Sequence, residues 1–141
     1  MPHRQFWLSN YVQDWIKNIL PGVPPDLGAE APLGQVMALF AKFIIGDRLA
    51  IPPADRFADL HVMEPEDKCV WNVRTVDARF YGWFLERDVF VCVNAMPKTT
   101  AKQVSQTGLI QEVVQKRNGM PPQLRGARTG SGYRDVLSDR V

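Results

Sequence analysis

The sequence predicts an α+β domain in which a small antiparallel β-meander is packed on one face by N-terminal helices and a C-terminal helix. Three observations predict this class. Apolar residues recur at helical spacing near the N-terminus, apolar and polar residues alternate over 70–94, and another helical pattern follows. A chain of 141 residues can bury a core. We expect one domain over residues 1–118 and a flexible tail, rich in Pro, Gly and Arg, over 119–141.

The first element is expected to be helical. Apolar residues recur at three- and four-residue steps between Leu8 and Ile19, so the sequence predicts a helix over residues 6–20 and no strand before it. Ser9 or Asn10 is suited to cap the start of this helix, and a Pro-Gly pair ends it.

A second helix is predicted over residues 32–46, after a Pro/Gly-rich linker. Pro32 suits the first helical turn and Gly46 suits the C-terminal cap. Its apolar face consists of Val36, Leu39, Phe40, Phe43 and Ile44. Periodicity is weak from residue 47 to 68, where prolines interrupt the pattern, although 58–63 can form a short extended piece.

The predicted meander has strands at 70–74, 79–84 and 89–94, joined by the turns "TVDA" and "LERD". A last helix is predicted over 107–119, where Asn-Gly provides the stop.

Four-residue loops would determine which strand residues lie opposite one another. They place Arg74 opposite Arg79, and Arg79 opposite Asn94. One face is then expected to be core and carries Trp71, Val73, Phe80, Phe84, Val89, Val91 and Val93. The other face is expected to be open and carries Asn72, Arg74, Arg79, Tyr81, Cys92 and Asn94, with Trp83 and Phe90 at its far end.

Arg74 and Arg79 are the strongest functional signal in the sequence. Like charges directly opposite each other on a sheet are destabilising, so the pair implies that an anion lies nearby. Arginine offers paired donors to phosphate oxygens, and single-stranded RNA is commonly bound with its bases stacked on aromatic or guanidinium planes. The alternative is that both arginines form ion pairs with Asp77 or Glu86 on a solvated sheet face.

Composition limits the other function classes. A net charge of +2 permits an acidic or nucleic-acid partner without requiring one. His3, His61, Cys69 and Cys92 lack the spacing of a metal site, so we expect no metal and no cofactor. His61 is interpreted as a partly buried loop residue or, alternatively, as a general base that reaches the sheet.

We expect a cytoplasmic protein without membrane contact. Charged residues interrupt the first apolar segment, so a signal peptide is not expected. No apolar run in the sequence is long enough to span a bilayer. Two cysteines do not make a disulfide framework, which agrees with a reducing compartment.

Several short motifs occur in a familiar order. Val-Arg at 73–74 ends the first meander strand, Arg-Phe-Tyr at 79–81 opens the second, and Lys-Thr at 98–99 follows the third. Together with the flanking helices, they resemble the RelE/HigB superfamily of bacterial toxins, and most closely its phage-related, HigB-like branch. The similarity covers residues 36–116.

This resemblance implies the toxin half of a toxin–antitoxin pair, a compact domain that cuts mRNA on the translating ribosome. The 2′-hydroxyl of a ribose would attack the neighbouring phosphate. Cations would stabilise the negative charge that develops, so a metal is unnecessary. A cognate antitoxin would be the protein partner. The alternatives are a non-catalytic protein of the same fold, perhaps encoded by a phage, that binds a host protein or nucleic acid, and a phage structural protein.

The resemblance also implies roles for single residues. Arg79 would contact the scissile phosphate, Lys98 would be a second cationic stabiliser, and Arg74 would be either structural or catalytic. Tyr81 could provide the acid or base that relatives carry near their C-terminal end. The residues expected to contact RNA are Asn72, Asn94, Thr99, Thr100 and Lys102.

Two features differ from the family pattern. Relatives commonly have an N-terminal strand, where this sequence predicts helix. After Lys98 the chain has no histidine, and its only tyrosine is Tyr133 in the expected tail. That tail is also basic. It is interpreted as a solvated end or as a flexible arm that adds salt-sensitive affinity for RNA.

Overall fold

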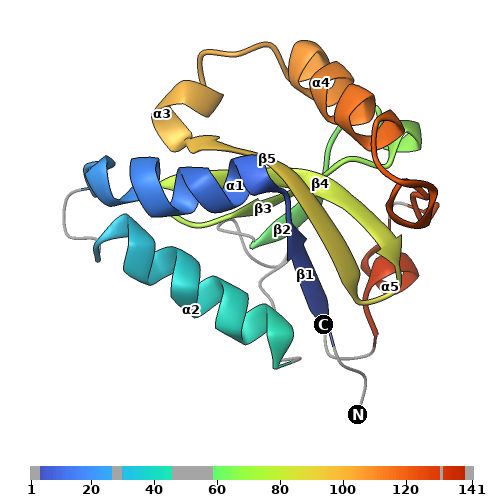
Figure 1. The fold of residues 1–141 in the computed structure, drawn as a ribbon, viewed down its shortest axis with the longest axis horizontal. Coiled ribbons are helices and arrows are strands. Elements are labelled where there is room, and N and C mark those ends of the chain that lie inside the picture. The colour runs from blue at the N-terminus through green and yellow to red at the C-terminus, as the bar shows by residue number, and fades with distance from the viewer. Residues whose placement is uncertain (1–3, 27–29, 46–58, 131, 139–141) are drawn as a thin grey trace.

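A computed structural model describes residues 4–26, 30–45, 59–130 and 132–138 (Figure 1). A five-stranded sheet lies between helices, which confirms the α+β class. The strands are β1 (Gln5–Leu8), β2 (Leu60–Val62), β3 (Trp71–Arg74), β4 (Ala78–Glu86) and β5 (Val89–Pro97). The α-helices are α1 (Asn10–Asp14), α2 (Pro32–Ile44), α3 (Lys98–Ala101), α4 (Gln106–Asn118) and α5 (Tyr133–Val136). A π-helix continues α1 over Trp15–Ile19, and short 3₁₀ turns cover Leu20–Gly22, Glu66–Lys68 and Pro122–Leu124.

The sheet is mixed rather than a simple antiparallel meander. Its strand order is β1-β5-β4-β3-β2, and the pairs from β2 to β5 are antiparallel. The predicted meander corresponds to β3, β4 and β5. The outer strand β1 runs parallel to β5. The chain returns to the sheet after crossing one face through α1 and α2 (Figure 1).

Strand β1 corrects the prediction of helix over 6–20. Phe6 and Leu8 point toward the core and alternate with the exposed side chains of Gln5 and Trp7, which is strand periodicity over four residues. Leu8 also falls at the helical spacing of the next segment, so periodicity alone did not reveal where the strand ends and the helix begins. The helix begins at Asn10, where Ser9 accepts the N–H of Val12 as the expected cap.

The first face of the sheet is covered by α1, the π-helix and α2 (Figure 1). Helix α2 begins at Pro32 as predicted, whereas Gly46 lies outside the described residues. Aromatic rings dominate this core, with ring centroids of Phe6 and Phe40 4.4 Å apart. The strand residues buried on this face are Leu60, Trp71, Val73, Ala78, Phe80, Phe84, Phe90, Cys92 and Ala95.

The second face is covered by α4, which corrects the prediction that helices cover only one face. Leu109, Ile110 and Val113 of α4 pack against it. The strand residues buried there are Tyr81, Trp83, Val91 and Val93. Tyr81 and Trp83, which were expected on the open face, therefore belong to a second core. The part of the second face that α4 leaves exposed lies toward the β3–β4 turn, beyond the start of α4.

The register of the second hairpin differs from the prediction. Glu86 pairs with Val89, so the turn between β4 and β5 consists of two residues rather than four. The register shifts at Phe84/Glu86 and again at Tyr81/Gly82. As a consequence Val91 and Val93 face α4, whereas Phe90 and Cys92 face the helices of the first side.

Part of the expected tail packs against the sheet, unlike the flexible end that was predicted, although most side chains of 121–130 are exposed. Val136 and Leu137 are buried in the first core. The backbone N–H of Asp88, in the β4–β5 turn, donates to the Val136 carbonyl, and the Tyr133 hydroxyl donates to the Leu60 carbonyl. Helix α5 lies beside the β4–β5 hairpin (Figure 1). The folded unit therefore extends past residue 118.

The longest described helices, α2 and α4, have 13 residues each. In the described ranges no helix is both long and apolar enough to cross a membrane.

Candidate functional site

The turn between β3 and β4 positions the candidate site. Thr75 Oγ1 accepts the N–H of Ala78, and a backbone hydrogen bond from Thr75 N to Ala78 O closes the turn. Arg74 and Arg79 flank this turn and lie directly opposite each other, as the sequence predicted. Both side chains are half-buried and project from the second face, away from the aromatic core.

The guanidinium of Arg79 is held by backbone carbonyls. One of its terminal nitrogens donates to the carbonyl oxygens of Thr75, at 2.5 Å, and of Ala78, at 2.9 Å. The carboxylate of Asp77 accepts other donors: the Asp26 N–H at 3.0 Å and Gln35 Nε2 at 2.7 Å. The hydrogen bonds of Arg79 therefore go to backbone carbonyls, rather than to the Asp77 carboxylate as the alternative interpretation expected.

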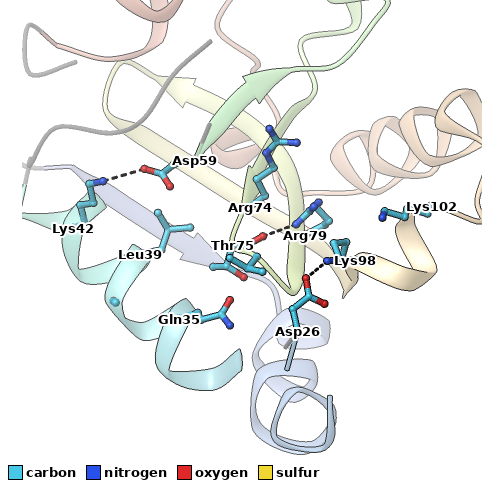
Figure 2. Close-up of a pocket in the computed structure, with 12 residues that line it drawn as sticks. Asp26, Gln35, Leu39, Lys42, Asp59, Arg74, Thr75, Arg79, Lys98 and Lys102 are labelled. Atoms are coloured by element: carbon cyan, nitrogen blue, oxygen red, sulfur yellow. Dashed lines mark hydrogen bonds and ion pairs between the residues drawn. The ribbon is translucent and has the colours of Figure 1, made fainter. Parts of the chain in front are cut away.

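Asp77 instead ties distant segments to the turn. It is only 3% exposed, and its carboxylate holds the backbone of residue 26 and the first turns of α2. Its carbonyl accepts the N–H of Lys98 at 2.8 Å, which fixes the start of α3. Lys98 also forms an ion pair with Asp26 (Figure 2), and this contact lowers the pKa of the Asp26 carboxyl. A buried carboxylate satisfied by several donors is a strong local constraint.

A hollow of about 570 Å³ opens between the β3–β4 turn and α2. Figure 2 shows Arg74, Arg79, Lys98 and Lys102 on one side of it and Lys42 of α2 on the other. Two carboxylates also line it, those of Asp26 and Asp59, and each is in an ion pair with a lysine. Among the described residues that line this first hollow, cations therefore outnumber carboxylates.

A second hollow, of about 320 Å³, adjoins the first. Its floor is the second face of the sheet near β2 and β3, and its wall is the segment from α3 to the start of α4. It shares Arg74, Arg79, Lys98 and Lys102 with the first hollow and adds His61, Asn72 and Tyr81. The two hollows together form the basic groove.

Burial and the arginine pair control ionisation in the groove. Burial lowers the pKa of Arg79, and the charge of Arg74 lowers it further. The pKa of His61 is lowered by burial first and then by Arg74. Burial raises the pKa of Tyr81 to about 12, against a smaller lowering by Arg79. At neutral pH the groove therefore combines charged guanidiniums with a neutral imidazole and a protonated phenol.

The groove contains no recognisable metal centre in the part of the chain that the structure describes, because no three His, Cys, Asp or Glu side chains gather there.

No protein-family model, curated protein or solved structure matches this chain.

Most of the predicted site residues meet in the groove. Arg74, Arg79, Lys98, Lys102, Asn72 and Tyr81 all line it. Thr99 and Thr100 are exposed on α3, and Thr99 lines a separate hollow with Asp26 and Lys98. Asn94, like both threonines, does not line the groove. It is 3% exposed and its Oδ1 accepts the N–H of Ala95, so it is a buried strand residue rather than an RNA contact.

Sequence reasoning missed Gln35, Lys42 and Asp26. Gln35 and Lys42 could have been identified from the sequence, because they are the only long polar side chains of α2. They lie seven residues apart, on one side of the helix. No sequence pattern indicated Asp26. Its contact with Lys98 joins segments separated by 72 residues and depends on the tertiary fold.

Proposed function

We propose that the chain is a RelE/HigB-like toxin that binds mRNA on the ribosome in the basic groove and cleaves it. The observation that carries the proposal is the cluster of Arg74, Arg79, Lys98 and Lys102, which lines both hollows. Two guanidiniums in register across neighbouring strands repel each other, and a phosphate between them would relieve that repulsion.

The order of the elements supports the proposal. A strand, two helices and an antiparallel meander follow one another, with Val73–Arg74 and Arg79–Tyr81 on adjacent meander strands. Strand β1 is the N-terminal element that relatives commonly have and that the sequence alone did not predict. Helix α4, packed on the second face, narrows the RNA-facing surface to the groove.

The groove has the groups that such chemistry needs. Arg79 and Lys98 would stabilise negative charge on the phosphate oxygens as the 2′-oxygen attacks phosphorus. The lowered pKa of His61 leaves it neutral at pH 7, so its Nε2 could exchange its contact with the Asn72 amide for the 2′-hydroxyl proton. The raised pKa of Tyr81 keeps its hydroxyl protonated, so it could donate to the departing 5′-oxygen.

Expression in a bacterial host tests the proposal. We expect wild-type protein to arrest growth and translation when no partner is present. Arg79→Ala should relieve the arrest, because a lost cation on a developing phosphate charge costs about 100-fold or more in rate. Arg125→Ala is the matched control, since Arg125 is exposed and outside the groove. Normal growth with abundant folded wild-type protein would count against the toxin assignment.

An antitoxin would neutralise this protein by covering the basic groove or the exposed apolar side chains of α2. Those side chains are Leu33, Met37 and Ile44, with Ile45 at the end of the helix. Action on ribosomes would also place the protein in the cytoplasm.

A non-catalytic binder of the same fold is the second candidate. Tyr81 is 3% exposed, and the hydroxyl of Tyr133 donates to the Leu60 carbonyl, so neither tyrosine projects freely from a terminal loop. RNA integrity in a purified translation extract distinguishes the two candidates. Cleavage at codon-dependent positions supports the enzyme, whereas inhibition with intact message supports the binder.

A further inference from the structure

Asn72 occupies an unusual position in the second hollow. It is 7% exposed, lies on β3 opposite Tyr81, and lines the hollow. Its Nδ2 lies 3.2 Å from Nε2 of His61. Its Oδ1 is buried and has no hydrogen-bond partner among the described residues. A buried acceptor without a donor is costly, and native proteins leave few of them.

The neighbouring contacts orient this amide. Because burial and the nearby arginines lower the pKa of His61, its ring is neutral near pH 7. Its Nδ1 lies 3.4 Å from the Val62 carbonyl, which suits a proton on Nδ1 and leaves Nε2 as the acceptor for the Asn72 amide. The Asn72 nitrogen is thereby occupied and its oxygen is left for a ligand.

The walls of the second hollow define what that ligand must look like. Met63, Val104 and Leu109 supply apolar surface, and Tyr81 supplies an aromatic side chain. At about 320 Å³ the hollow is at the lower end of the size of small-molecule sites. The four cations shared with the first hollow stand at its border. A flat group with an N–H donor on its edge and an attached phosphate fits these features.

We propose that the second hollow is a nucleobase subsite. It takes a base with an exocyclic amino group, whose hydrogen is accepted by Asn72 Oδ1, while the phosphate of the same nucleotide lies at Arg79 and Lys98. The inference deepens the proposed function, because it rests on RNA as the ligand of the groove and assigns base preference to Asn72. Amide side chains commonly recognise such base edges.

Direct binding to the purified full-length chain tests this subsite without ribosomes. The probes are adenosine 5′-monophosphate and purine riboside 5′-monophosphate, which differ only in the amino group, together with inorganic phosphate. NMR titration gives each affinity and also follows the side-chain amide signals of Asn72. We expect the amino group to tighten binding about tenfold, the typical effect of pairing a buried polar group. The Asn72 signals should shift with the adenosine nucleotide and not with inorganic phosphate.

Three variants separate the two parts of the site. Asn72→Leu should abolish the tenfold difference and leave the affinity for inorganic phosphate unchanged. Arg79→Ala should weaken all three probes. Asn118→Leu, at an exposed position on α4, should change nothing. Should Asn72→Leu fail to fold, the ratio of the two nucleotide affinities on wild-type protein still decides.

Equal affinity of wild-type protein for the two nucleotides would overturn the inference, as would a tenfold difference that survives in Asn72→Leu. These outcomes are separate from those of the proposed function. Cleavage of the message in the translation extract, without a preference between the two nucleotides, would support the toxin assignment and reject the nucleobase subsite. A nucleotide preference with intact message would leave the subsite and favour the non-catalytic binder.

Discussion

At the scale of single residues, the basic groove depends on groups whose ionisation the fold has altered. Arg79 keeps its charge although burial and Arg74 oppose it, while His61 and Tyr81 are held in their neutral forms. Strand alternation and turn length placed Arg79 and Tyr81 on one face, and the family resemblance implied their roles. The sequence could not give their ionisation, because burial depends on α3 and α4, which reach the groove only in the folded chain.

The stability of the protein should fall in mild acid because of His61. Its pKa in the folded chain lies below the unfolded value of 6.5, so the unfolded chain binds more protons as the pH drops through 6.5. The charged neighbours described in the same hollow are Arg74, Arg79, Lys98 and Lys102, and the two arginines disfavour a charged imidazole.

Urea unfolding at pH 7.5 and 5.5 measures this effect. We expect wild-type protein to lose more free energy of unfolding on acidification than His61→Gln, in which the ionisable group is absent. An NMR titration provides a direct check. An imidazole of His61 that titrates above pH 6.5 would contradict the argument.

At the scale of elements, the β4–β5 hairpin shows where local pattern reasoning is limited. Strand positions were predicted correctly, but a two-residue turn and two register shifts moved Val91 and Val93 to the opposite face. Alternation indicates which residues of one strand share a face. A bulge changes which residues of the neighbouring strand lie on that same face. The shift also buries Asn94, which was expected to contact RNA.

Gly82 is required by this bulged pairing. A Cβ atom at Gly82 would lie 1.8 Å from the carbonyl oxygen of Val91, a backbone atom that cannot move without breaking the pairing. We expect Gly82→Ala to lower the free energy of unfolding by about 3 kcal/mol or more. Gly22→Ala is the control, because no atom of the described residues lies within 4 Å of its added Cβ. Chemical denaturation measures both, and similar stabilities would refute the register.

At the scale of the whole molecule, the first and last described residues, Arg4 and Ser138, both contact Asp88 in the β4–β5 turn. Arg4 and Asp88 form a buried ion pair, and the Asp88 carboxylate also accepts the N–H of Ser138 at 2.9 Å. Val136 and Leu137 complete the first core. The C-terminal segment is thus part of the fold, although its composition predicted a flexible tail.

Leu137→Ala tests this conclusion. Leu137 is 1% exposed, and removing a buried leucine side chain costs about 2–5 kcal/mol of stability. Leu33→Ala, at a position that is 37% exposed, should cost less than about 1 kcal/mol. Thermal or urea unfolding compares the two. A Leu137 variant as stable as the Leu33 variant would mean that the C-terminal segment does not contribute to the core.

The sequence by itself determined the α+β class, α2, the meander strands and the pairing of Arg74 with Arg79, because these follow from periodicity and one short turn. Only the tertiary structure decided the strand at the N-terminus, the helix on the second face and the docking of the C-terminal segment. Each of these depends on partners far along the chain: β1 on β5, α4 on β4 and β5, and Leu137 on the aromatic core. Local patterns cannot encode such contacts, since burial is a property of the assembled core.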